Sequence, residues 1–199
     1  MTAAPPAPAL PPAMPQLPQH GGRRLCAWYL RRCGWRIEGT FPDLPRLVLI
    51  AAPHSSWWDG WWALITKVAL GADVAFVGKR ELFVGPLGWL LRTLGGIAVD
   101  RGSAHGVVEQ MVARFATSPR LWLALAPEGT RRHVASWRTG FWHIAHAAGV
   151  PILPVAFDYP RRTIVIGTPR CSSGDVEADV AALRAWYRPF RGKHHDVAA

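Results

Sequence analysis

The sequence predicts an α/β fold, with a single domain whose central sheet is mixed, largely parallel and flanked by helices. Two observations predict it. Short apolar runs rich in β-branched residues alternate with longer stretches of helical character, and parallel strands covered by helices on both faces have this continuous apolar pattern. The chain has 199 residues, 50% of them hydrophobic, which is enough to bury the core of one domain. The expected strands are 47–52, 74–77, 97–99, 121–126, 152–157 and 163–166, and the expected helices are 58–70, 86–94, 104–117, 137–148 and 176–187.

The two ends differ in composition from the domain between them, residues 23–190. Residues 1–22 contain seven prolines and no apolar segment typical of a secretion signal, so we expect a disordered leader rich in proline and alanine. Residues 191–199 are expected to form a flexible tail in which His194 and His195 are solvated.

Residues 23–34 are expected to form a short basic helix that carries Trp28 and Tyr29. Such a helix can lie in a membrane interface, with arginines on lipid phosphates, or pack on the domain, and the two are compatible. The net charge is +10, and 20 of the 23 basic residues are arginines. That excess favours anionic partners such as acidic phospholipids, coenzyme A phosphates, an acidic carrier protein or nucleic acid. No stretch of 18 uncharged apolar residues is present, so no transmembrane helix is expected.

The first candidate for chemistry is the H-x4-D segment, in which His54 and Asp59 follow the expected strand 47–52. Residues five apart do not meet on a regular helix, but a tight turn before a helix can bring them together. The aspartate then fixes the imidazole tautomer, and the other ring nitrogen is free to take a proton from a hydroxyl. Taken alone, this spacing is also explained by an aspartate that caps a helix.

Two further segments place charged residues after apolar strands. P-E-G-T-R (residues 127–131) follows the strand 121–126, and G-x-I-x-V-D-R (residues 95–101) contains the strand 97–99. Chemistry in parallel sheets usually sits at the carboxyl ends of strands, and arginines there can bind a phosphate. Structural ion pairs are the alternative for each segment.

Other polar and aromatic residues receive weaker interpretations. Four tryptophans at the start of the expected helix 58–70 form i,i+4 pairs on two adjacent faces: Trp57, Trp58, Trp61 and Trp62. We expect one of these faces to line an acyl-chain tunnel or touch lipid rather than only to pack in the core. His143 and His146 share a helix face, but no cysteine or carboxylate accompanies them, so no metal site is expected. The three cysteines form no C-x-x-C pair, which indicates reduced thiols rather than a disulfide framework or zinc site.

The order of four blocks resembles the glycerolipid acyltransferase family, which includes the 1-acylglycerol-3-phosphate acyltransferases. The blocks are H-x4-D, G-x-I-x-V-D-R, P-E-G-T-R and V-P-I-L-P-V (residues 150–155). The resemblance implies a glycerol-3-phosphate acyltransferase-like fold and His54 as general base with Asp59 as its partner. It also implies a set of acceptor-binding residues, namely Lys79, Arg101, Glu128, Gly129, Thr130 and Arg131.

The same resemblance implies transfer of a fatty acyl group from acyl-CoA or acyl-carrier protein to a lysophospholipid hydroxyl, without metal or cofactor. It places the protein peripherally on the inner, cytoplasmic face of the cell membrane, with an anionic membrane surface as partner. Two alternatives stay open: the same chemistry on a non-glycerophosphate lipid acceptor, and a non-catalytic basic module that binds membrane or nucleic acid. The module predicts steep salt dependence and indifference to His54, and no nucleic-acid motif is evident.

Overall fold

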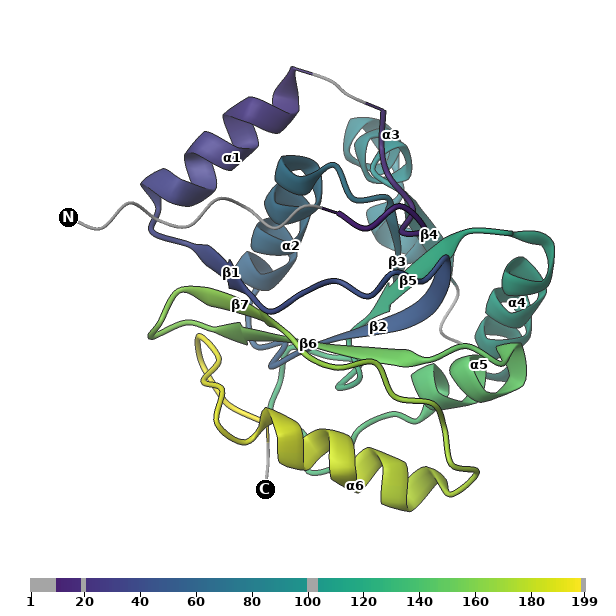
Figure 1. Ribbon diagram of the computed structural model, residues 1–199. Helices are drawn as coiled ribbons and strands as arrows, with labels where there is room; N and C mark the ends of the chain where they lie inside the picture. The colour runs from purple at the N-terminus through teal and green to yellow at the C-terminus, as the bar shows by residue number, and fades with distance from the viewer. Residues whose placement is uncertain (1–9, 19–20, 100–103, 198–199) are drawn as a thin grey trace.

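The computed structural model describes residues 10–18, 21–99 and 104–197 and confirms the α/β fold. Seven strands form one sheet in the order β1-β7-β6-β2-β5-β3-β4 (Figure 1). The strands are β1 (Arg36–Glu38), β2 (Arg46–Ala52), β3 (Val74–Lys79), β4 (Gly96–Val99), β5 (Leu121–Leu125), β6 (Ile152–Asp158) and β7 (Thr163–Ile166). Neighbouring strands are parallel except β6 and β7. Because β1 is parallel to β7, these two strands run opposite to the rest, which makes the sheet mixed and largely parallel.

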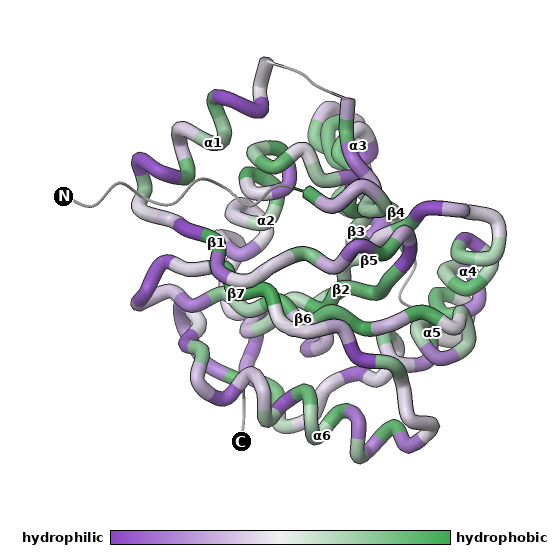
Figure 2. Tube along the Cα trace, viewed as in Figure 1, coloured by the Kyte–Doolittle hydropathy of each residue, from purple (hydrophilic) through white to green (hydrophobic). Residues whose placement is uncertain are grey.

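Helices cover both faces of this sheet. They are α1 (Gly22–Arg32), α2 (Trp57–Leu70), α3 (Gly85–Thr93), α4 (Ala104–Thr117), α5 (Gly140–Ala148) and α6 (Val176–Tyr187), with a 3-10 turn η1 (Arg80–Leu82) before α3. Figure 1 shows α1, α2 and α3 on one side of the sheet and α4, α5 and α6 on the other. The hydropathy colours of Figure 2 show apolar central strands and an outer helix α6 that alternates between apolar and polar residues.

Each face of the sheet has its own apolar layer. Tyr187 of α6 is fully buried in the layer under α4, α5 and α6. Its hydroxyl donates to the Ile50 carbonyl (2.7 Å) and accepts from the Val155 amide (3.0 Å), so the ring is fixed against two central strands. Trp122 of β5 is fully buried in the layer under α1 and α2, and its indole N–H donates to the Leu44 carbonyl at 2.8 Å.

Two elements differ from the sequence prediction. β1 was not predicted, because its three residues include two charged ones and no apolar run; it exists through its pairing with β7. α5 begins at Gly140 rather than at residue 137, because the long loop after β5 continues to that point. Trp137 is buried from this loop and packs against Tyr187, with ring centroids 5.4 Å apart.

The expectation of a disordered leader is wrong for residues 10–18. Met14 is fully buried in the layer under α1 and α2. The Leu17 amide donates to the Gly71 carbonyl (2.8 Å), and the Asp73 amide donates to the Pro15 carbonyl (2.9 Å). Prolines cannot build a helix here, but an extended segment can still satisfy its backbone groups against a turn of the domain. Residues 1–9 and 19–20 lie outside the described residues.

The expectation of a flexible tail is wrong for residues 191–197, whereas the side chain of His194 is exposed, as expected. Val197 is buried in the layer under α4, α5 and α6. The His195 imidazole contacts the Arg131 carbonyl, and the Lys193 amide donates to the hydroxyl of Ser55. Sequence composition could not show this, because polar residues can be held by hydrogen bonds as well as solvated.

The basic helix expected over residues 23–34 is α1, and it packs on α2. Its Tyr29 ring stacks on Trp62 (centroids 5.8 Å apart) and meets Trp61 edge-on. Leu25 and Trp28 remain 65% and 55% exposed. The helix therefore packs with one face and keeps large apolar side chains at the surface. Among the described residues, no helix is long and apolar enough to cross a bilayer.

Candidate active site

The H-x4-D residues converge at the carboxyl end of β2. Nδ1 of His54 lies 3.3 Å from Oδ2 of Asp59. The local sequence explains this turn: Ser56 caps α2 and Asp59, three residues later, accepts from the Ser56 amide, so the two form a capping box. The capping role of Asp59 is therefore compatible with its position beside the His54 imidazole. With Nδ1 facing the carboxylate, Nε2 on the far edge of the ring is the nitrogen available to a substrate.

Asp59 is 1% exposed, yet its carboxylate is well supplied with donors. Oδ2 accepts from the amides of Ser55 and Ser56, both at 2.7 Å, and Oδ1 accepts from the hydroxyl of Tyr159. These hydrogen bonds hold both carboxylate oxygens in place. Burial, and then the Asp59 carboxylate, raise the pKa of Tyr159, so that its hydroxyl stays protonated and donates. A buried carboxylate is thereby fixed beside the imidazole of His54.

The P-E-G-T-R segment follows β5, which pairs with β2. It holds the backbone of the H-x4-D turn (residues 54–59). Oε2 of Glu128 accepts from the His54 amide at 2.6 Å. Glu128 is 3% exposed, and burial raises the pKa of its carboxyl group to about 7. Its Oε1 is buried and has no hydrogen-bond partner among the described residues. The side chain thus ties the P-E-G-T-R loop to the backbone of His54 from within the protein.

Gly129 and Thr130 shape the same loop. Gly129 has a φ of 66°, a conformation that favours glycine, and a Cβ there would lie 2.6 Å from Cδ of Arg138, whose side chain would have to move. Oγ1 of Thr130 accepts from the Arg132 amide at 3.3 Å. These two residues turn the chain so that Arg131 projects at the surface.

The structure positions Arg131 and places Lys79 farther away. The Arg131 guanidinium lies over the ring of Trp57, with 3.6 Å between its Cζ and the ring centroid. Lys79 ends β3 and is exposed; β3 is separated from β2 by β5, so Lys79 lies at the same edge of the sheet but two strands away from His54. Arg101 lies outside the described residues.

The tryptophan run divides between core and surface. Trp62 is buried, with its ring centroid 5.0 Å from that of Trp35. Trp57, Trp58 and Trp61 are exposed, and the first two carry cations: Arg131 on Trp57, and Nζ of Lys193 at 4.7 Å from the Trp58 centroid. At Trp62 packing accounts for the side chain. The other three rings lie at the surface of the first two turns of α2.

Residues that sequence reasoning missed complete the site. Tyr159 directly follows β6, whose carboxyl end lies beside that of β2, so the strand-end rule was a signal that could have found it. Ser55 is a second such residue, because its Oγ accepts backbone hydrogen bonds from Lys193 and His194. No sequence pattern indicated the contribution of residues 191–197.

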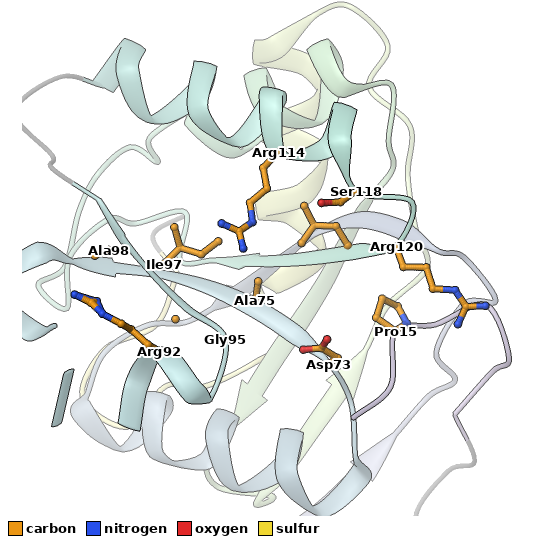
Figure 3. Close-up of a pocket in the computed structure, with 12 residues that line it drawn as sticks. Pro15, Asp73, Ala75, Arg92, Gly95, Ile97, Ala98, Arg114, Ser118 and Arg120 are labelled. Atoms are coloured by element: carbon orange, nitrogen blue, oxygen red, sulfur yellow. The ribbon is translucent and has the colours of Figure 1, made fainter. Parts of the chain in front are cut away.

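A hollow of about 480 Å³ lies at the opposite edge of the sheet, where Asp73 precedes β3 and Arg120 precedes β5. Figure 3 shows Arg114 reaching into it from α4, while Arg120 extends away. It is remote from the carboxyl end of β2 and has no part in the His54 chemistry. His143 and His146 also lie elsewhere, on α5, where Nδ1 of His146 contacts Oγ of Ser172 at 2.9 Å. Within the described ranges, no three His, Cys, Asp or Glu side chains gather as a metal site.

Comparisons with known proteins agree with this geometry. A family described as Acyltransferase matches residues 38–158. The chain is 40% identical over 89 residues to the 1-acyl-sn-glycerol-3-phosphate acyltransferase of Escherichia coli (strain K12), covering 40% of this chain and 35% of that protein. It is 37% identical over 152 residues to the human lysophospholipid acyltransferase LPCAT4, covering 71% of this chain and 27% of that protein.

Among solved structures, the chain resembles the crystal structure of the 1-acyl-sn-glycerophosphate (LPA) acyltransferase PlsC from Thermotoga maritima. The TM-score is 0.52 at 20% sequence identity, over 82% of this chain and 79% of that one. At this identity the likeness supports the fold alone. The chain spans 27% to 45% of the length of the curated relatives named for E. coli, Haemophilus influenzae and human.

Proposed function

This chain belongs to the acyltransferase family, and from that premise we propose that it transfers a fatty acyl group from a thioester to a hydroxyl of a lysophospholipid such as 1-acylglycerol-3-phosphate. The observation that carries the proposal is the pairing of His54 with a buried, fully hydrogen-bonded Asp59 at the carboxyl end of β2. Relatives whose names specify this acceptor support the choice of lysophospholipid. The donor in the proposal is acyl-CoA or acyl-carrier protein.

In the proposed step, Nε2 of His54 takes the proton of the acceptor hydroxyl while its oxygen attacks the thioester carbonyl carbon. The tetrahedral intermediate collapses with cleavage of the C–S bond, and the imidazolium returns the proton to the leaving thiolate. General-base assistance contributes about 10²–10⁴-fold. Asp59 keeps Nδ1 protonated and stabilises the imidazolium, because its own charge is held by two amides and Tyr159. Every group in this step comes from the chain and the two substrates.

The acceptor's phosphate is proposed to bind Arg131. Its guanidinium is exposed on the face of Trp57, so it is available to an anion while the ring limits its motion. Glu128 links this loop to the His54 backbone, so the base and the cation belong to one connected unit. Such a connection matters because reacting atoms must be held close to their final geometry.

An anionic membrane surface is the proposed partner, at the inner face of the cell membrane. Large apolar side chains are exposed on α1 and at α3, which Figure 1 shows on the same side of the sheet. They are Leu25, Trp28, Val84, Leu87, Trp89 and Leu90. Amphipathic surfaces of this kind, with arginines such as Arg24 and Arg31 nearby, bind anionic interfaces.

Vesicle sedimentation tests the membrane proposal. Trp28→Glu and Trp89→Glu should each weaken binding to vesicles that contain phosphatidylglycerol, while Ala147→Glu on α5, at the opposite side of the sheet, should leave it unchanged. Equal binding by all three variants would contradict the proposed face.

The activity test uses purified protein with acyl-CoA or acyl-carrier protein and a panel of lysolipids, including a phosphate-free monoacylglycerol, with products identified by mass spectrometry. His54→Ala should abolish transfer without unfolding the protein, and His143→Ala, an exposed histidine on α5, should leave it unchanged. Near-normal transfer by His54→Ala removes the mechanism. Transfer to monoacylglycerol as fast as to 1-acylglycerol-3-phosphate rejects the phosphate-bearing acceptor.

A further inference from the structure

The C-terminal segment (residues 191–197) directly contacts the catalytic turn, which is the H-x4-D turn of residues 54–59. Oγ of Ser55, inside the H-x4-D segment, accepts from the amides of Lys193 (2.9 Å) and His194 (3.2 Å). Ser55 is buried, and these two bonds are themselves partly buried. The side chain of Lys193 adds a contact to the ring of Trp58 in the first turn of α2. One end of the segment is thus fixed to the residue that follows the catalytic histidine.

The same segment contacts the loop that carries Arg131. Nε2 of His195 lies 2.9 Å from the Arg131 carbonyl. Since a carbonyl only accepts, this nitrogen carries the proton and donates. The His195 ring also meets His133 edge-on, with centroids 5.7 Å apart. The backbone of the proposed phosphate-binding residue is therefore bonded to a segment that is itself bonded to Ser55.

A third contact reaches the loop after β6. The Tyr159 amide donates to the Arg191 carbonyl at 3.0 Å, and the Tyr159 hydroxyl donates to Asp59. The segment is closed into a compact turn by Asp196, whose carboxylate accepts from the Gly192 amide at 2.9 Å and pairs with Arg191. A segment with so many internal and external bonds behaves as a rigid bridge rather than as a loose end.

We propose that residues 191–197 form part of the active site and set the spacing between His54 and Arg131. His195, Lys193 and His194 act as positioning residues: they hold the Arg131 loop and the catalytic turn so that the acceptor's phosphate and hydroxyl reach their partners together. The inference rests on the proposed function and deepens it. A shift of about 1 Å in such an arrangement lowers rates by up to about 100-fold.

Gly192→Ala tests this bridge with a minimal change. A Cβ at Gly192 would lie 2.1 Å from the His195 carbonyl oxygen and 3.0 Å from Oγ of Ser55, so the turn cannot close around it. Gly140→Ala is the matched control, because a Cβ there meets nothing within 4 Å. His195→Ala removes the bond to Arg131 together with the ring contact to His133, and His195→Gln restores a donor.

Acceptor and donor kinetics are measured for each variant, with thermal unfolding recorded in parallel. We expect Gly192→Ala to raise the acceptor KM at least about tenfold and His195→Ala to raise it roughly three- to tenfold, with the acyl-donor KM unchanged. His195→Gln should recover part of the loss, and Gly140→Ala should match the parent protein. Unchanged acceptor KM in folded His195→Ala overturns the inference, as does an equal rise in both KM values, which indicates general damage.

Amide hydrogen exchange provides a readout that does not depend on activity. The Lys193 and His194 amides should exchange slowly in the parent protein and at least about tenfold faster in Ser55→Ala, which removes their acceptor. Exchange at the unprotected rate in the parent protein overturns the bridge even if transfer is observed. Absence of transfer by the parent protein, with these amides protected, instead rejects the proposed function.

Discussion

The buried carboxyl group of Glu128 makes the stability of this protein depend on pH, and Glu128→Gln isolates that dependence. Glu128 is nearly inaccessible, and desolvation raises the pKa of its carboxyl group from 4.5 to about 7 despite the His54 amide that it accepts. The folded protein therefore binds more protons at this site than the unfolded chain between these two pH values. Stability falls wherever the folded state binds more protons and pH rises.

The size of the effect follows from the pKa change. One pKa unit corresponds to about 1.4 kcal/mol, so the free energy of unfolding should fall by about 3 kcal/mol as pH rises from below 4.5 to above 7. Glutamine keeps an oxygen that can accept from the His54 amide and has no charge to bury. The variant should therefore lack this part of the pH dependence, and it should be the more stable protein above pH 7.

Urea denaturation of both proteins between pH 4 and 8 measures the difference. The informative quantity is the difference between the two proteins in free energy of unfolding at each pH, because other groups titrate equally in both. This difference should be small near pH 4 and grow to about 3 kcal/mol above pH 7. Two curves that remain parallel across this range would refute the assignment of a neutral, desolvated carboxyl to Glu128.

Three other substitutions test contacts around the site. Tyr159→Phe removes the hydroxyl bonded to Asp59. It should lower kcat without raising the acceptor KM, as steady-state kinetics can measure, and it should lower the free energy of unfolding in urea by about 1.5–3 kcal/mol. Trp57→Ala removes the ring under Arg131 and should raise the acceptor KM about two- to fivefold, whereas an effect on acyl-chain length alone would support a tunnel role. Lys67→Met leaves the carbonyls of Val74 and Leu94 without their donor and should destabilise by about 1–3 kcal/mol in urea, with exposed Lys79→Met as the neutral control.

Local patterns predicted the fold well, because the buried strands are continuous apolar runs. β2, β5 and β6 lie in the middle of the sheet, and their composition alone marks them. The short edge strand β1 has no such pattern, since its stability comes from pairing with β7. The buried Met14 shows the same limit, because a proline-rich segment carries no periodicity that would reveal its docking on α2 and β3.

The candidate site was predictable as far as its residues come from strand ends. His54 and Asp59 meet as expected, and the E-G-T-R segment lies beside them, because β2 and β5 are parallel neighbours. The exact partners were not predictable. Glu128 was expected to shape the acceptor site, and the bond that it makes to the His54 backbone depends on a loop conformation that Gly129 permits.

The contacts that hold His54 and Asp59 explain why the spacing between these two residues is, by itself, a weak sign of this chemistry. His54 and Asp59 can be placed together by one capping turn, but that turn supplies donors only to Oδ2 of the buried carboxylate and none to Oδ1. Here Tyr159 after β6 donates to Asp59, Glu128 after β5 holds the His54 backbone, and residues 193 and 194 hold Ser55. Each of these contacts joins residues more than 70 positions apart in the chain. The reactive geometry is therefore a property of the folded sheet edge, and the H-x4-D spacing becomes informative only together with the segments that supply those contacts.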